Sequence, residues 1–164
     1  MKHSPNFSAI TPTRTGNLSN YSMSPALQAT NFAFKFGGNI KIKTAGTYTF
    51  YTASDDGSKL YLNTFDAAGQ VVNNDYLQGV TERSGTVSLT AGKHPIYVTY
   101  FQKGGGATLL VKYQGPGISK TLIPDSVLVN SNTTINTPPL PIVTLAQNYL
   151  TTQLIPSFQI KVSF

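Results

Sequence analysis

Cysteine is absent from this 164-residue sequence, so no disulfide bridge stabilises the fold and no thiol is available as a nucleophile. Charged residues make up only 11% of the chain, whereas threonine, serine, asparagine, glycine and tyrosine are abundant. This composition is typical of a secreted β protein rather than a cytoplasmic enzyme, and we expect an extracellular or cell-surface location. Long apolar runs are missing too, which predicts no membrane insertion.

The first five residues, Met1-Lys2-His3-Ser4-Pro5, lack the apolar stretch of a signal peptide. We therefore expect the chain to be a module of a larger protein, attached to other domains, whose targeting information lies elsewhere. Its length predicts one domain with a further short piece, and it suffices to bury a hydrophobic core.

Acidic residues are scarce, six against twelve basic ones, and the formal net charge is +6. Such a balance can indicate a nucleic-acid partner, but the basic residues here are dispersed. Lys35 stands between two phenylalanines, and Lys41 and Lys43 alternate with isoleucines. This is the polar face of half-buried strands rather than a basic patch, so we expect no nucleic-acid partner.

Apolar and polar residues alternate with a period of two throughout the chain, and helical periodicity is nowhere convincing. Turn residues, mostly glycine, separate the alternating segments. Many short strands at this spacing predict an all-β fold, an antiparallel β-sandwich or squat barrel. The predicted strands are Phe32–Phe36, Asn39–Thr44, Gly46–Ala53, Lys59–Asn63, Gly69–Val72, Gly85–Leu89, Lys93–Phe101 and Ala107–Tyr113.

The composition changes after Val129, which divides the chain into three predicted parts. Residues 5–129 form the β domain, and residues 130–141 are a linker rich in threonine, asparagine and proline. In the tail, residues 142–164, the segment Phe158–Phe164 alternates like a strand. It is either an extra strand at an edge of the sandwich or the start of a second β domain.

Two of the six acidic residues, Asp55 and Asp56, are adjacent and precede Gly57. Neighbouring carboxylates repel each other, and a hard cation that prefers oxygen ligands would offset this repulsion. Asp-Gly between two alternating segments is equally a hairpin signal. From these residues alone, a turn and a metal site are about equally favoured.

Catalysis is not expected from this sequence. A glycosidase needs two carboxyl groups in different environments, whereas Asp55 and Asp56 share one, and Glu82 is the only glutamate. No Gly-X-Ser-X-Gly motif is present, and His3 and His94 do not belong to a set of zinc ligands. We therefore expect a binding module and not an enzyme.

As a block, residues 31–128 resemble the PA14 domain family. The resemblance rests on several ordered motifs and covers roughly three-quarters of the chain with the segment before it. The motifs are Asn31–Ile40 (NFAFKFGGNI), Ala45–Leu62 (AGTYTFYTASDDGSKLYL), Val71–Asp75, Gly85–Ile96, Tyr100–Ala107 and Gly115–Lys120.

The resemblance implies an antiparallel β-sandwich found in secreted hydrolases, adhesins and toxins, many of which bind carbohydrate. In the sugar-binding adhesins the ligand is held through calcium, and the pair that chelates the ion corresponds to Asp55 and Asp56. Family members join these two residues by a cis peptide bond. The implied cofactor is therefore Ca²⁺ and the implied partner is a glycan or polysaccharide.

Further calcium ligands must come from another part of the chain, and the segment from Gln102 to Ala107 is the best candidate. Gln102 offers a side-chain oxygen, and Gly104, Gly105 and Gly106 allow backbone carbonyls to approach an ion closely. The alternative is a flexible hairpin tip, which the sequence favours unless the resemblance is taken into account.

A second polar cluster, Asn73, Asn74 and Asp75, is predicted to supply an ion ligand or a sugar contact, or else to be an ordinary polar loop. Tyr76 or Tyr61 is a candidate to stack on a sugar ring, and the sequence does not single out either. The leading hypothesis is a calcium-dependent, lectin-like carbohydrate-binding module. The alternative is a structural spacer or protein-interaction module with at most a structural calcium.

Overall fold

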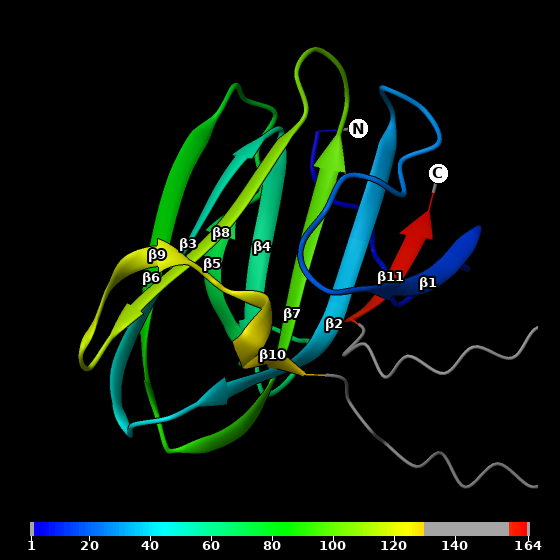
Figure 1. The fold of residues 1–164 in the computed structure, drawn as a ribbon. Coiled ribbons are helices and arrows are strands. Elements are labelled where there is room, and N and C mark those ends of the chain that lie inside the picture. The colour runs from blue at the N-terminus through cyan, green and yellow to red at the C-terminus, as the bar shows by residue number, and fades with distance from the viewer. Residues whose placement is uncertain (1, 130–157, 164) are drawn as a thin grey trace, which may run out of the picture.

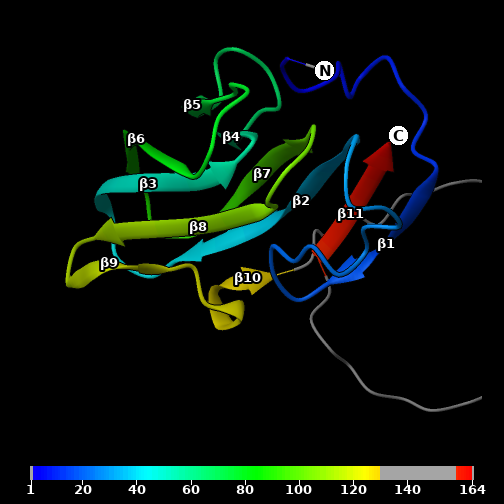
Figure 2. The same ribbon diagram turned by 90° about the horizontal axis from the view of Figure 1, so that it is seen from above.

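The computed structural model describes residues 2–129 and the backbone of residues 158–163. Two antiparallel sheets face each other, as Figures 1 and 2 show from two directions. This arrangement confirms the predicted β-sandwich. Among the described residues, no helix has the length and apolar character needed to cross a membrane.

The large sheet has seven strands in the order β1-β11-β2-β7-β4-β5, with β10 also pairing with β2. Its strands are β1 (Arg14–Leu18), β2 (Phe32–Ile42), β4 (Gly57–Leu62), β5 (Gln70–Asn74), β7 (Gly92–Gln102), β10 (Leu128–Val129) and β11 (Phe158–Ser163). The small sheet has the order β6-β3-β8-β9. Its strands are β3 (Gly46–Asp55), β6 (Thr81–Leu89), β8 (Thr108–Gly115) and β9 (Ile118–Leu122). A short 3-10 helix, η1 (Asp125–Val127), precedes β10.

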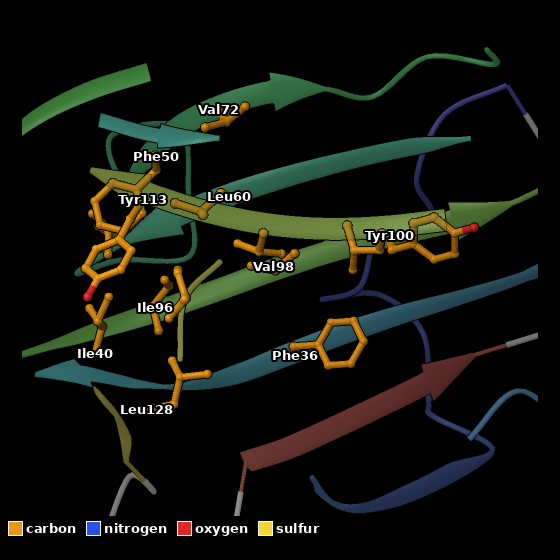
Figure 3. Packing of buried hydrophobic residues seen from close by; sticks show 14 of the residues in the cluster. Phe36, Ile40, Phe50, Leu60, Val72, Ile96, Val98, Tyr100, Tyr113 and Leu128 are labelled. Carbon is orange, nitrogen blue, oxygen red and sulfur yellow. The ribbon is translucent and has the colours of Figure 1, made fainter. Parts of the chain in front are cut away.

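The core lies between the sheets and is built from the inward half of each alternating strand (Figure 3). Tyr48, Phe50 and Thr52 of β3 are all buried, as their shared face predicts. Each large side chain removed from water contributes about 1.5–3 kcal/mol of stability. The buried residues labelled in Figure 3 come from both sheets: Phe36, Ile40, Phe50, Leu60, Val72, Ile96, Val98, Tyr100, Tyr113 and Leu128.

One predicted break in the sheet is wrong. The segments Phe32–Phe36 and Asn39–Thr44 were predicted as separate strands, but β2 runs through Gly37 and Gly38 without interruption. These glycines pair with Tyr97 and Ile96 of β7. A Cβ on Gly37 would lie 3.2 Å from the Tyr97 ring, so the glycine leaves room for that side chain and is not a turn.

The backbone of β11 lies between β1 and β2 and is antiparallel to both. Ile160, for example, pairs with Gly16 on one side and Phe36 on the other. The tail strand is thus in the interior of the large sheet. The predicted linker, residues 130–141, lies outside the described residues.

The chain crosses from the small sheet to the large one between β3 and β4, with Asp56 as the single residue between the two strands. The loops after β5 and β7 reach the same end of the sandwich, since they supply the hydrogen bonds to Asp56 described below. This crossing therefore brings the predicted site segments together.

Candidate functional site: two aspartates at the sheet crossing

The peptide bond between Asp55 and Asp56 is cis, and this pair occupies the crossing itself. The next residue, Gly57, is tightly enclosed by its neighbours and leaves no room for a side chain. A Cβ there would lie 2.3 Å from the Phe101 ring and 2.9 Å from the Tyr76 nitrogen. Only glycine fits between these neighbours without displacing them, so Gly57 lets the loop after β5 pack directly against the crossing.

Asp56 is buried, with 3% of its side chain exposed. Its Oδ1 accepts a hydrogen bond from the Gln78 backbone nitrogen (3.2 Å), and its Oδ2 accepts one from the Lys103 nitrogen (2.7 Å). The two bonds come from different loops, after β5 and after β7. The Lys103 ammonium is directed elsewhere, to the Asn31 side-chain oxygen at 3.0 Å. Backbone amides therefore hold the carboxylate while no lysine or arginine neutralises it within the described residues.

Asp55 lies on the more open side of the pair. Burial, and then the neighbouring Asp56 charge, raise the pKa of its carboxyl above the ordinary value. Within the part of the chain that the structure describes, no hydrogen bond or ion pair to this carboxylate is found. A Cβ on Gly106 would be 3.5 Å from Asp55 Oδ2, so the carboxylate lies beside the glycine loop.

The Gln102 side chain organises that loop. Its Nε2 donates to the carbonyl oxygens of Gly104 (2.9 Å) and Gly106 (2.8 Å), while its Oε1 accepts from the Asp56 nitrogen at 3.2 Å. Gly105, with φ of 81°, has the left-handed conformation that glycine tolerates best. Gln102 thus ties the glycine loop to the aspartate pair.

The Tyr100 hydroxyl lies beneath the crossing, within hydrogen-bonding reach of the Asp55 carbonyl and 2.7 Å from Gln102 Oε1. Burial, with the two aspartate charges, raises the pKa of Tyr100. The phenol therefore stays protonated and serves as a donor. Because Gln102 Oε1 already accepts from Tyr100 and from the Asp56 nitrogen, a cation would have to compete for it. Ligation by Gln102 stays a prediction.

The second predicted cluster is divided between two roles. Asn73 and Asn74 end β5, and so they do not belong to the predicted loop. Asn74 is fully buried and connects the two sheets through its side chain. Its Nδ2 donates to Thr52 O, Ser54 Oγ and Thr81 O, and its Oδ1 accepts from Gln78 Nε2 and Arg83 Nε.

Asp75 is as buried as Asp56 but has a complete set of partners. Lys59 Nζ lies 2.7 Å from its Oδ2, and both the nitrogen and the hydroxyl of Ser4 donate to its Oδ1 at 2.7 Å. His3 Nδ1 lies 2.6 Å from the Asp75 carbonyl oxygen. These contacts fasten the N-terminal arm to the sandwich. Tyr76, in contrast, is 44% exposed, with the Arg83 guanidinium 4.8 Å from its ring centre.

The sequence did not point to the groups that hold the two buried aspartates. The Gln78 and Lys103 amides act through the backbone, which leaves no signal in side-chain type. Lys59 and Ser4 are ordinary polar residues until the fold brings them to Asp75. Alternation does place Lys59 on the outer face. Its partner Asp75 lies 16 residues further along the chain, and the two meet only because β4 pairs with β5.

The aspartate pair fits a hard cation better than a soft one. Across the described residues, no group of three or more His, Cys, Asp or Glu side chains gathers to hold a metal. The oxygen donors at the crossing are two carboxylates with backbone carbonyls of the adjacent glycine loop. Calcium accepts such mixed oxygen ligands, together with water, in flexible geometry. Asp55 and Asp56 would hold the ion. The Gly104 and Gly106 carbonyls could join them only through their second lone pairs, because each already accepts a hydrogen bond from Gln102 Nε2.

Comparison with known proteins agrees with this architecture. The family model of the PA14 domain matches residues 2–126. The chain belongs to the PA14 domain family. A PA14 sugar-binding domain from an RTX adhesin aligns with a TM-score of 0.53 and 27% identity, covering 62% of this chain and 56% of that one. That neighbour is described as a sugar-binding domain.

Relatives of another kind are anti-sigma factors. Anti-sigma-I factor RsgI3 of Acetivibrio thermocellus is 28% identical over 102 residues. The match covers 62% of this PA14 chain and only 15% of RsgI3. A solved anti-sigma factor domain-containing protein aligns with a TM-score of 0.61 and 25% identity, covering 81% of this chain and 44% of that chain. The chain thus corresponds to a minor part of the curated relative.

Proposed function

We propose that this PA14 domain is a calcium-dependent carbohydrate-binding module. The observation that carries the proposal is the pair of adjacent carboxylates at the sheet crossing, of which Asp56 is held by backbone amides and neither is neutralised by a lysine or arginine among the described residues. The similarity to a PA14 sugar-binding domain of an adhesin supports the same function. Binding, and not catalysis, is what the site is suited to.

Each residue has a distinct part in the proposed site. Asp56 is fixed by the Gln78 and Lys103 amides and forms the rigid side of the ion site. Asp55 approaches from the open side, and the loop that Gln102 shapes presents carbonyls next to it. Bound calcium supplies coordination positions for two vicinal sugar hydroxyls. Tyr76 offers an exposed ring, from the same loop as Gln78, for the apolar face of a sugar.

A glycan array probed with the full chain, in millimolar calcium and in chelator, tests this proposal. We expect glycan binding only with calcium. Asp55→Asn and Asp56→Asn should each abolish it, and Glu82→Gln, a charge change on the small sheet, is the matched control. Calcium-independent binding of the same strength, or full binding by Asp56→Asn, would refute the proposed site.

Gly105→Val provides a second test of the glycine loop. The left-handed φ of 81° is costly for a β-branched residue, so the substitution should distort the loop. We expect weaker calcium and glycan binding together. Unchanged affinities would show that the loop is only a connector.

The second candidate is a structural or interaction module in which an ion only ties loops together. Calcium binding without any glycan on a broad array would favour it. We further propose that the domain works at the cell surface or outside the cell, which its similarity to an adhesin domain supports. We also propose that it is attached to other domains, as its match to only 15% of an anti-sigma factor suggests.

A further inference from the structure

The outer face of the large sheet, which points away from the core, carries a hollow of about 430 Å³. This volume falls within the range of about 300–1,000 Å³ typical of small-molecule sites. Lys59 and Tyr61 of β4 and Thr99 of β7 form its floor, because alternation directs them outward. The N-terminal arm, residues 4–8, and the loop with Phe65 are its two walls.

These walls are fixed by contacts. Phe7 is buried with Ala33 and Phe101 on the outer face, and Phe65 packs against this group. The Ser4 hydrogen bonds to Asp75 hold the arm at its other end. Figure 2 shows the N-terminal segment passing on the side of the large sheet that faces away from β3 and β8. The hollow is therefore part of the folded domain.

The lining combines aromatic rings with polar groups. The Tyr61 and Phe65 rings meet edge to face at 4.8 Å between centres, and the Lys35 ammonium lies 3.5 Å above the Phe65 ring. Burial, and then the Asp75 charge, raise the pKa of Tyr61 to about 12, so its hydroxyl remains a donor. Thr99 Oγ1, buried in the floor, has no hydrogen-bond partner within the described residues.

The two charged side chains that line the hollow are engaged within the protein, so neither requires a ligand of opposite charge. Lys59 is already paired with Asp75, and the Asp66 carboxylate accepts from Thr64, Ala68 and Gly69 of its own loop. The hollow places the Tyr61 and Phe65 rings beside the Thr99 hydroxyl and the Gln70 carboxamide. Such a lining suits a molecule with an apolar face and a hydroxylated edge. A sugar ring has both.

A second hollow of about 220 Å³ adjoins the first and shares Ser4 and Lys59 as walls. Tyr76 lines its other side. The loop of Tyr76 also supplies the Gln78 amide that binds Asp56. The two hollows thus extend from the neighbourhood of the aspartate pair across the outer face.

We propose that the larger hollow is a second carbohydrate subsite, and that a glycan held at Asp55 and Asp56 continues past Tyr76 into it. The ligand class is then a neutral oligosaccharide chain rather than a single terminal sugar. The continuity rests on the proposed function, whereas the outer-face subsite uses no calcium and can be tested alone.

Amide chemical shifts of the isotope-labelled full chain provide the first test. The probes are glucose-, galactose- and xylose-based hexasaccharides, each added in chelator and in calcium. With at least one probe, we expect shifts at Lys59, Tyr61 and Gln70 in both conditions, and at Asp55 and Asp56 only with calcium. No shift at the outer face with any probe overturns the subsite.

The two proposals fail in different ways. Shifts confined to the aspartate pair in calcium would support the proposed function and exclude the second subsite. Shifts confined to the outer face, unchanged by chelator, would support the subsite and exclude calcium-dependent binding.

Variants sharpen the assignment. Tyr61→Leu should weaken binding of the best hexasaccharide in chelator about tenfold, the loss expected for one ring contact, and leave the calcium-dependent shifts at Asp55 and Asp56 in place. Tyr51→Leu, on the outer face of the small sheet, is the matched control. If Tyr61→Leu does not fold, Gln70→Ala at an exposed position should give a loss of about threefold. Wild-type affinity in the variant that folds contradicts the subsite.

Discussion

Asp56 and Asp75 are equally buried, each with 3% of the side chain exposed, but their surroundings differ. Asp75 has a lysine ammonium, a serine hydroxyl and an amide around its carboxylate. Asp56 has two backbone amides and a second carboxylate as its neighbour in the chain. A buried charge needs a partner, and at Asp75 the protein provides it from its own side chains. At Asp56 the described residues provide backbone amides but no side-chain cation, and we propose that calcium takes that place.

The largest effect is expected when the complete charge pair is broken. Asp75→Asn removes the negative charge opposite the Lys59 ammonium and loosens the N-terminal arm. The free energy of unfolding should fall by about 3 kcal/mol. Urea denaturation in chelator measures this. Glu82→Gln is the control, because Glu82 pairs with Lys112 and Lys120 at the surface and its loss should cost about 1 kcal/mol or less. An equal loss of unfolding free energy in Asp75→Asn and Glu82→Gln would show that the buried Asp75 pair matters no more than a surface pair.

Calcium binding at Asp55 and Asp56 should stabilise the folded domain. If calcium binds only the folded state, about a hundredfold excess over Kd should add ~2.7 kcal/mol to the free energy of unfolding. The domain should also fold without the ion, because its core lies between the sheets and does not include the crossing. Thermal midpoints in calcium and in chelator check both points. Identical midpoints in wild type, or a full calcium response in Asp55→Asn, would contradict the assignment.

Gly57 lies between the Asp55–Asp56 pair and the loop that carries Asp75 and Tyr76. A larger residue at this position should disturb both. In Gly57→Ala the new methyl group would meet the Phe101 ring and the backbone of Asp75 and Tyr76. Overpacking of this kind costs about 1–3 kcal/mol, and calcium affinity should fall as well. Gly16→Ala in β1 is the control, since a Cβ there would meet no atom within 4 Å beyond its chain neighbours. Calorimetric titration that finds full calcium affinity in a destabilised Gly57→Ala protein would show that the regions are independent.

The smallest expected effect is the pH dependence caused by Asp55. Its pKa in the folded state is raised above 3.8, so the ionised form is less favourable in the folded chain than in the unfolded chain. In chelator, the contribution of the Asp55 carboxyl to stability is present below pH 3.8 and is lost as the pH rises through its pKa in the folded state. Asp55→Asn should remove the dependence. With calcium the stabilisation should instead grow over the same window, because the ion requires the carboxylate.

Sequence reasoning recovered most of the strands because alternation directly reports a half-buried sheet. It misplaced the break at Gly37 and Gly38, where glycine accommodates the Tyr97 ring from a strand far along the chain. At the candidate site, Asp55 and Asp56 were predicted from their adjacency and from the family motif. Asn74 was predicted to supply an ion ligand or a sugar contact, or to be part of a polar loop, and this role stays a prediction. In the structure both ends of its carboxamide form hydrogen bonds that link the two sheets, which sequence reasoning did not predict.

The sequence alone determined the β-sandwich class, the family and the adjacency of two carboxylates before Gly57, because these depend on local order along the chain. That the chain crosses between the sheets there, and forms no hairpin, appeared only in the structure. The tertiary structure decided which carboxylate pairs with a lysine and which is held only by backbone amides. Lys59 reaches Asp75 through the pairing of β4 with β5, and amides from two separate loops converge on Asp56. It also decided that the N-terminal arm closes a hollow on the outer face. Such contacts join residues distant in the chain, and their formation depends on how the strands pair.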